Sequence, residues 1–311
     1  MTSEAVVLVA HGTVDSLDDL PEFLTNIRRG HPAPAELLAE VRRRYEAIGG
    51  QSPLNAINRE LARKLEARLG LPVRLSNRLF APYPRDVLGA LAASGVTRVR
   101  VVPLAQHSAH VYGEAVREAA RDRGIEVTAA PNWGRTPALT DAFARAIVAS
   151  VREGAGEGGA ALLMTAHSLP MSVVEAGDPY EEEFRASAED VAARARALAP
   201  GVIVAHAVAF QSQGMSTGAG GRPMPWLGPD LRHQMEELAA HGHRTVVVAP
   251  IGFLADHVEI LYDLDIEARA WADELGIALR RTRSLNASDA LVDVLAVVAK
   301  ALEPKEGATS V

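Results

Sequence analysis

Residues 250–269 read P-I-G-F-L-A-D-H-V-E-I-L-Y-D-L-D-I-E-A-R and directly follow the apolar run T-V-V-V-A at 245–249. A short β-branched run that ends at Pro and Gly is typical of a buried strand in a parallel sheet. The residues after it predict a helix, with Asp256 as its N-cap and Glu259 three positions later as in a capping box. A strand followed by a helix is the repeating unit of an α/β fold.

Three carboxylates follow one another along this predicted helix: Glu259, Asp263 and Glu267. Their four-residue spacing places them on one face, where each like-charged pair costs about 0.2–0.5 kcal/mol. A solvated acidic face is the commonest reason for such a row. This row, however, begins beside His257 at the carboxyl end of a strand, where open α/β sheets bind ligands. Because carboxylates suit hard, hydrated divalent cations, we interpret the row as a path for a metal ion or for protons.

The rest of the chain repeats this pattern in two similar halves. The strand ends V-A-H-G-T, at His11, and T-A-H-S-L, at His167, occupy corresponding places. We therefore predict two Rossmann-like lobes, each a parallel sheet flanked by helices, at 1–153 and 154–304, with the active-site cleft between them. Gly154–Gly159 is the expected linker, and 305–311 an expected disordered tail. The predicted strands are Ala5–Ala10, Val73–Phe80, Arg98–Val102, Glu126–Ala129, Ala160–Ala166, Val202–Phe210, Thr245–Ala249 and Ala278–Arg281.

Composition limits the chemistry. The 311 residues suffice for two medium domains, and a net charge of −7 argues against nucleic-acid binding. Zero cysteines exclude disulfides, a thiolate nucleophile and a cysteine-ligated iron–sulfur cluster, so metal chemistry must use histidines and carboxylates. No apolar run is long enough for a transmembrane helix, and the N-terminus does not resemble a signal peptide. These features predict a cytoplasmic protein without a transmembrane segment.

Histidines lie at the predicted ends of several strands. A single histidine there is more often structural than catalytic, but five in similar places favour a shared site. No pair has the H-x₃₋₅-H spacing of structural zinc sites, and the nearest pair, His107 and His110, has only two residues between its members and is a weak signal. Neither the G-x-S-x-G of hydrolases nor the G-x-G-x-x-G of dinucleotide sites is present. The five are His11, His107, His110, His167 and His257.

Two segments outside the predicted strands carry candidate binding residues. Arg28 and Arg29 precede a Pro-rich turn, and Arg44 with Tyr45 ends a basic run. They form either a solvated basic face or a clamp for ligand carboxylates, which arginine binds well. The long Gly- and Pro-rich loop at 211–230 contains Trp226, and loops of this length are functional lids or disordered.

Short motifs across nearly the whole chain, in the same order, resemble those of the ferrochelatases, the class II chelatases that insert Fe²⁺ into a porphyrin in haem synthesis. Together they are far more specific than any one of them alone. The motifs are I-R-R-G at 27–30, R-Y-E-A-I-G-G-Q-S-P-L at 44–54, A-H-S-L-P at 166–170, G-D-P-Y at 177–180, F-Q-S-Q-G at 210–214, P-W-L-G-P-D at 225–230 and G-F-L-A-D-H-V-E-I-L-Y-D-L-D-I-E at 252–267.

This resemblance implies site residues. His167 corresponds to the active-site histidine of the family and Glu259 to the carboxylate opposite it, and a His167 near neutrality could accept a pyrrole proton. Asp263 and Glu267 correspond to an acidic ladder on a helix with a π-type turn, where a hydrated divalent ion such as Mg²⁺ can sit. His11 adds a nitrogen donor for iron. Fe²⁺ is a substrate, and no cofactor or iron–sulfur cluster is required.

The expected porphyrin contacts are His11 over the macrocycle centre, Trp226 against its face, and propionate partners among Arg28, Arg29, Arg44, Tyr45 and Ser52. Coproporphyrin III is favoured over protoporphyrin IX. The segment G-T-V-D-S-L-D-D-L-P-E-F-L after His11 is acidic where a membrane-docking lip would be apolar. Haem or coprohaem is the expected product and a monomer the expected state.

Three features depart from the family pattern. His11 stands where coproporphyrin-type enzymes usually carry tyrosine, the segment at 106–109 is one residue short, and the Met215–Pro223 loop is longer. Two alternatives remain: a sirohydrochlorin-type cobalt or nickel chelatase, and a non-catalytic tetrapyrrole carrier. The carrier is disfavoured because it would need neither His167 nor Glu259.

Overall fold

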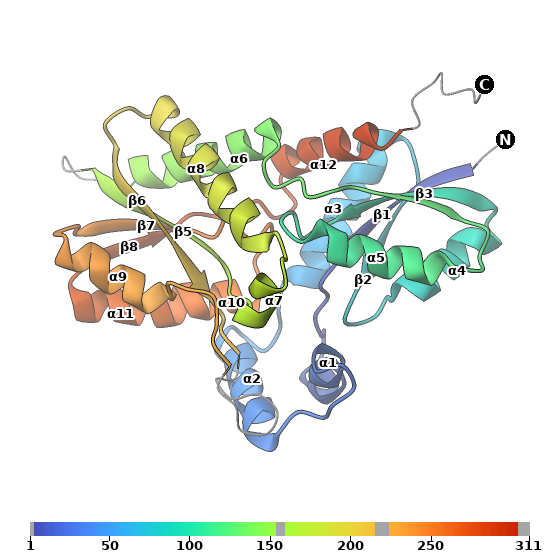
Figure 1. The fold of residues 1–311 in the computed structure, drawn as a ribbon, viewed down its shortest axis with the longest axis horizontal. Helices are drawn as coiled ribbons and strands as arrows, with labels where there is room; N and C mark the ends of the chain where they lie inside the picture. The colour runs from blue at the N-terminus through green and yellow to red at the C-terminus, as the bar shows by residue number, and fades with distance from the viewer. Residues whose placement is uncertain (1–2, 154–158, 215–223, 304–311) are drawn as a thin grey trace. The chain divides into compact units, whose positions relative to one another are not determined.

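The computed structural model describes residues 3–153, 159–214 and 224–303. Two four-stranded parallel sheets are present there, with strand orders β2-β1-β3-β4 and β6-β5-β7-β8 (Figure 1). All eight predicted strands are confirmed, three of them with the predicted bounds. The strands are β1 Ser3–Ala10, β2 Val73–Asn77, β3 Val96–Pro103, β4 Glu126–Ala129, β5 Ala160–His167, β6 Ile203–Gln211, β7 Thr245–Ala249 and β8 Ala278–Arg281.

Helices connect the strands, as parallel pairing requires. They are α1 Leu20–Ile27, α2 Ala35–Ala47, α3 Leu54–Leu69, α4 Pro84–Ala93, α5 Ala109–Ala120, α6 Pro137–Arg152, α7 Met171–Glu175, α8 Tyr180–Leu198, α9 Leu231–Ala240, α10 Val258–Leu261, α11 Ala268–Leu275 and α12 Asp289–Ala301, with a π-helical segment, Asp263–Glu267, between α10 and α11. Within the ranges that the structure covers, no helix combines the length and apolar character needed to cross a bilayer.

The described chain forms two compact units, each containing one sheet. The first consists of 3–33, Leu54–Trp133 and 287–303, and the second of Pro34–Pro53 and Gly134–Asn286. This grouping differs from lobes at 1–153 and 154–304, because α2 and α6 belong to the second unit and α12 to the first. Packing explains the difference: α6 lies against α8, and α12 against α3. The predicted tail, most of the predicted linker and the Met215–Pro223 loop lie outside the described residues.

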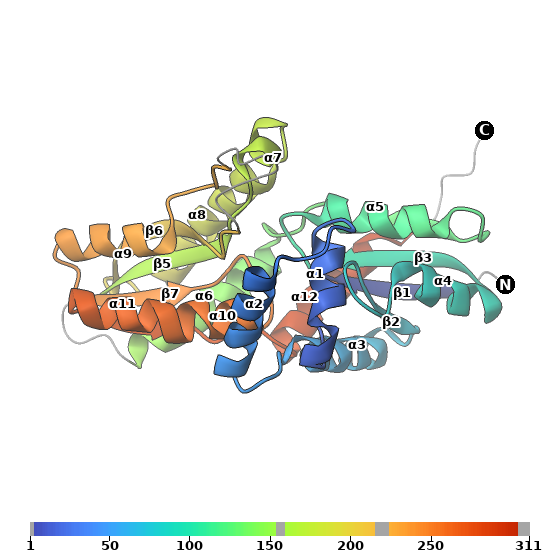
Figure 2. The same cartoon turned by 90° about the horizontal axis from the view of Figure 1, so that it is seen from below.

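In the first unit, residues 5–10 of the inner strand β1 are fully buried, since helices cover both faces of the sheet. Leu88 of α4 and Val116 of α5 pack with Val7 and Val101 on one face. Helices α3 and α12 pack together on the other face (Figure 2). This double covering produces the continuous apolar runs that identified the strands.

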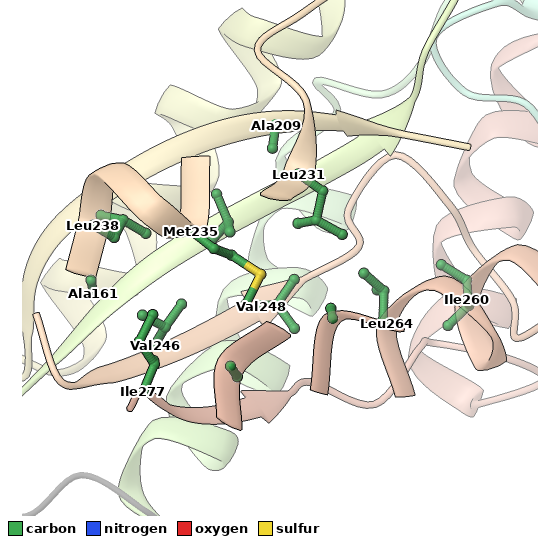
Figure 3. Close-up of a cluster of buried hydrophobic side chains, with 13 residues drawn as sticks. Ala161, Ala209, Leu231, Met235, Leu238, Val246, Val248, Ile260, Leu264 and Ile277 are labelled. Carbon is green, nitrogen blue, oxygen red and sulfur yellow. The ribbon is translucent and has the colours of Figure 1, made fainter. Parts of the chain in front are cut away.

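In the second unit, the acidic helix is anchored through its apolar side. Ile260, Leu264 and Ala268 belong to a buried cluster with Met235 of α9 and Val248 of β7. Figure 3 shows Ile260 and Leu264 directed into this cluster from the helix. Burying one isoleucine or leucine side chain contributes roughly 1.5–3 kcal/mol, so the cluster holds the helix against the sheet. The acidic residues are thereby kept on its other sides.

Candidate active site

His167 is the last residue of β5, at the carboxyl edge of the second sheet. Its backbone is held on both sides: the Tyr180 hydroxyl donates to the His167 carbonyl (2.9 Å), and the Ser168 amide donates to the Gln211 carbonyl (2.7 Å). The His167 Nδ1 contacts the Ser168 carbonyl, which directs Nε2 away from the strand. The Ser168 carbonyl therefore orients the imidazole through Nδ1, and Nε2 is the nitrogen that faces Glu259.

Glu259 reaches His167 because the loop after β7 crosses closely over β5. The Gly252 amide donates to the Thr165 carbonyl (2.9 Å), and a Cβ at Gly252 would collide with Ala166. Only glycine therefore allows this approach. The Glu259 Oε1 lies 3.5 Å from the His167 Nε2. On its other side, Oε2 lies 3.4 Å from the Nε2 of His257, so the carboxylate sits between two imidazoles.

His167 and Glu259 are both charged at neutral pH. Burial disfavours the charge on His167, but the adjacent Glu259 carboxylate outweighs it and raises the pKa of His167 to about 9. Burial likewise opposes ionisation of Glu259, yet His167 and His257 hold the pKa of this carboxyl well below its usual range. The expectation of a pKa near neutrality for His167 was therefore wrong. At pH 7 it is an imidazolium facing a carboxylate.

The acidic row continues as the sequence predicted, although not on a regular helix. Asp263 begins the π-helical segment, and the Glu267 amide donates to the carbonyl of Tyr262, five residues back (3.0 Å). Asp263 is 4% exposed and accepts a hydrogen bond from Ser212 Oγ (2.5 Å). Burial, followed by the charge of Glu259, raises the pKa of Asp263 to about 7. This carboxyl can thus gain or lose a proton at neutral pH.

The outer end of the row opens on a small cavity of about 280 Å³. Arg44 of α2 lines it together with Asp263 and Glu267, and its Nη1 lies 3.5 Å from Asp263 Oδ1. The Arg44 guanidinium also covers the Tyr262 ring, 5.1 Å from its centroid, and pairs with Glu40 at 2.8 Å. The row therefore runs from the His167–Glu259 pair to a cavity that is lined by the positively charged guanidinium of Arg44.

Asp256 is not the N-cap that the sequence suggested. His257 occupies that position, and α10 begins at Val258. The Asp256 carboxylate instead accepts hydrogen bonds from Arg281 (3.0 Å), Ser284 (2.7 Å) and Asn286 (2.9 Å). Residues far along the chain thus bind Asp256 in place of a local capping box. A pattern of neighbouring residues could not reveal these partners.

The predicted porphyrin contacts are distributed over the molecule. Arg28 and Arg29 directly follow α1 in the first unit, where Arg29 is exposed. In the second unit, Tyr45 and Ser52 are each only 2% exposed. Trp226 lies in a short bridge with Pro170, three residues from His167, and packs against Gly214. Arg44, also a predicted porphyrin contact of the second unit, lies at the acidic row, 3.5 Å from Asp263.

The remaining strand-end histidines differ in their surroundings. His11 is exposed, and its Nδ1 lies 3.2 Å from the Tyr112 hydroxyl. His107 is 2% exposed, and burial lowers its pKa to about 4, which is consistent with a neutral structural residue. His257 packs on Phe253 and contacts Glu259. Across the described ranges, no three His, Asp or Glu side chains form a preassembled metal site.

Sequence reasoning gave no role to several residues that hold the site. Tyr180 fixes the His167 carbonyl, and Gln211 Nε2 donates to the Glu259 carbonyl (3.0 Å). Ser212 binds Asp263. All three lie in the G-D-P-Y and F-Q-S-Q-G motifs, so their place in these motifs was the sign in the sequence that they belong to the site. Their roles became visible only from the contacts.

Comparison with known proteins identifies the family. The ferrochelatase family model matches residues 3–302. A ferrochelatase of Acidobacterium capsulatum is 38% identical, over 95% of this chain and 93% of the relative. A coproporphyrin III ferrochelatase of Anoxybacillus flavithermus is 34% identical, over 97% of both chains.

Solved structures confirm the two-unit fold. SirB from Bacillus subtilis with Fe³⁺ has a TM-score of 0.60, covering 97% of this chain and 96% of its own. Its identity is only 14%, so this likeness concerns the fold alone and gives no support to the sirohydrochlorin alternative. The whole-chain family match and the identities of 34% and 38% are decisive. The chain therefore belongs to the ferrochelatase family, the metal-inserting enzymes of haem biosynthesis.

Proposed function

We propose that this ferrochelatase inserts Fe²⁺ into coproporphyrin III and that His167 and Glu259 carry its proton chemistry. The observation that supports these roles most directly is the 3.5 Å contact between the two side chains at the carboxyl edge of the second sheet. Their side chains are 36% and 32% exposed, so a ligand can reach them.

The reaction exchanges two pyrrole protons for one Fe²⁺, so the protein must accept and release two protons for each turnover. Glu259 is ionised at pH 7 and can accept the first. Protonating Glu259 removes the charge that holds the proton on His167. His167 can then release that proton to Asp263 or water and, as a neutral imidazole, accept the second pyrrole proton. Asp263, with a pKa of about 7, can receive protons from this pair and release them towards Glu267 and the cavity.

The acidic row suits protons better than a resident cation. A divalent ion such as Mg²⁺ at Asp263 and Glu267 would meet the Arg44 guanidinium, which lies 3.5 Å from Asp263. Like charges at this distance repel strongly away from bulk water. We therefore assign Asp263 and Glu267 to proton release and to the passage of Fe²⁺, which requires Arg44 to move.

Coproporphyrin III carries four propionates and needs more cationic partners than protoporphyrin IX, which carries two. The name of the Anoxybacillus flavithermus relative supports this substrate, as does the acidic segment after His11. Arg44 is part-buried beside the site and is our leading propionate partner, followed by Arg28 or Arg29, Tyr45 and Ser52. The cytoplasmic location and the monomeric state remain predictions.

Replacing Arg44 with alanine should lower kcat/KM for coproporphyrin III by about 10- to 100-fold, mainly through KM, because a charge-assisted hydrogen bond contributes roughly 1.5–3 kcal/mol. Steady-state kinetics with both porphyrins measure this effect. Arg43→Ala is the matched control, since Arg43 is more exposed and also pairs with Glu40. Equal or better kcat/KM for protoporphyrin IX, unaffected by Arg44→Ala, would rule out coproporphyrin III as the preferred substrate.

His11 is proposed to ligate the iron of the product. It is exposed and directly follows β1, and neutral imidazole binds haem iron readily. The His11→Ala variant should therefore lose the histidine-ligated absorbance spectrum of the product complex. His110→Ala is the control. A His11→Ala spectrum identical to that of the unmodified protein would place the nitrogen ligand elsewhere.

A further inference from the structure

The π-helical segment begins at Asp263, four residues after Glu259, and is not a favoured helix geometry. The Tyr262 carbonyl receives both the Ile266 amide (3.1 Å) and the Glu267 amide (3.0 Å), so the regular ladder is interrupted there. Single π turns are rare and are frequent at functional sites. Contacts outside the helix are therefore needed to hold this one in place.

Arg281, the last residue of β8, provides such contacts. Its Nε and Nη2 donate to the two oxygens of Asp265 at 2.7 and 2.8 Å, a bidentate pair in the middle of the π-helical segment. Its Nη1 donates to Asp256 Oδ1 at 3.0 Å. The Arg281 and Asp256 side chains are 15% and 19% exposed, so one guanidinium bridges two part-buried carboxylates.

The Asp256 end of this bridge is held by two further side chains. Asn286 holds Asp256 twice: its Nδ2 donates to the carboxylate, and its Oδ1 accepts the Asp256 amide at 2.8 Å. Ser284 adds a third hydrogen bond, at 2.7 Å. Asp256 directly precedes His257, and Asp265 follows Asp263 by two residues. The bridge therefore spans the segment that carries both proton-handling carboxylates.

We propose that Arg281 is a positioning residue for iron insertion: by binding Asp256 and Asp265 together, it sets where the carboxylates of Glu259 and Asp263 lie. This inference rests on the roles proposed above for those two residues. Arg281 acts on them through Asp256 and Asp265. Lysine cannot replace it, because an ammonium lacks the planar fork that binds one carboxylate bidentately while reaching a second.

A structural role alone is the competing explanation. Removing the guanidinium leaves two part-buried carboxylates without their cation, which destabilises a protein whatever its activity. The two explanations differ in kinetics. A positioning role predicts a loss in kcat per folded molecule, because the carboxylates are misplaced, while porphyrin binding is retained.

The test compares Arg281→Gln, Arg281→Lys and Asp265→Asn with Arg280→Gln, in which the neighbouring exposed arginine of the same strand is replaced. We expect kcat to fall roughly 10- to 100-fold in the first three, the range found when residues supporting a metal site are replaced. The KM for porphyrin should stay within about twofold. Arg280→Gln should leave both constants unchanged. The double variant Arg281→Gln/Asp265→Asn should be no slower than Arg281→Gln, since the two changes remove one interaction.

An unchanged kcat per folded molecule, with only a lower melting temperature, would overturn the proposal. If Arg281→Gln does not fold, Asp265→Asn decides, because it keeps the contact between Arg281 and Asp256. Glu259→Gln is assayed in parallel. Full activity of Glu259→Gln would refute the proposed function, whereas an inactive Glu259→Gln beside fully active Arg281 and Asp265 variants would refute only this inference.

Discussion

Replacing His167 with alanine is expected to lower kcat for iron insertion by roughly 100- to 10,000-fold, the usual contribution of a positioned acid or base. The imidazole lies at a strand end and fills no core volume, so the fold and porphyrin binding should persist. Anaerobic assays that follow the absorbance of coproporphyrin III with Fe²⁺ measure the rate. Fluorescence quenching of the bound porphyrin measures binding separately.

His206 offers a matched control for this variant. It forms a similar pair with a glutamate, Nε2 lying 2.9 Å from Glu189, but it lies on β6 against α8, apart from the acidic row. His206→Ala should insert iron at the normal rate. Full turnover by a correctly folded His167→Ala protein would falsify the assignment of His167.

The same pair predicts a dependence of stability on pH. The pKa of His167 rises on folding from its ordinary 6.5 to about 9, so its contribution is complete below pH 6.5 and is lost as the pH rises through 9. Glu259 has the opposite sign: its lowered pKa contributes above pH 4.5 and is lost in acid. The melting temperature of His167→Ala should therefore fall furthest below that of the unmodified protein between pH 4.5 and 6.5, and the difference should shrink at pH 10.

The fold was largely predictable because its signals are local. Central strands such as β1 and β5 are buried on both faces, so their sequences are continuous apolar runs. The boundaries between the two units were harder to predict from the sequence. The apolar face of α12 does not indicate which sheet it covers, and the helix returns to the first unit although it ends the described chain.

Candidate site residues could be proposed from the sequence, but the contacts that hold them could not. Recognisable motifs contain His167, Glu259 and Asp263. Glu259 contacts His167, and Asp263 follows Glu259 by four residues. Arg281 acts on residues 16 and 25 positions earlier, and no helical or strand periodicity connects such pairs. The ionisation of His167 was also hidden, because it depends on the 3.5 Å separation from Glu259.

Glu259 and Glu267 occupy opposite ends of the acidic row, and this predicts unequal effects of the same substitution. Glu259→Gln should lower kcat by roughly 100- to 10,000-fold, because it removes the first proton acceptor and the charge that polarises His167. Glu267→Gln should cost less than about tenfold, since Asp263 can still release protons into the cavity and water can replace an outer carboxylate.

Fe²⁺ titrations at saturating coproporphyrin III distinguish the two variants. We expect Glu267→Gln to raise the KM for Fe²⁺ with little change in kcat, and Glu259→Gln to lower kcat at every iron concentration. Glu274→Gln is the control, because Glu274 lies further along α11 and pairs with Arg232 at 3.1 Å. Equal and severe losses of kcat for Glu259→Gln and Glu267→Gln would show that the row acts as one unit without an inner and an outer end. Protons and iron would then need all three carboxylates at once, and Asp263→Asn should be as inactive as either.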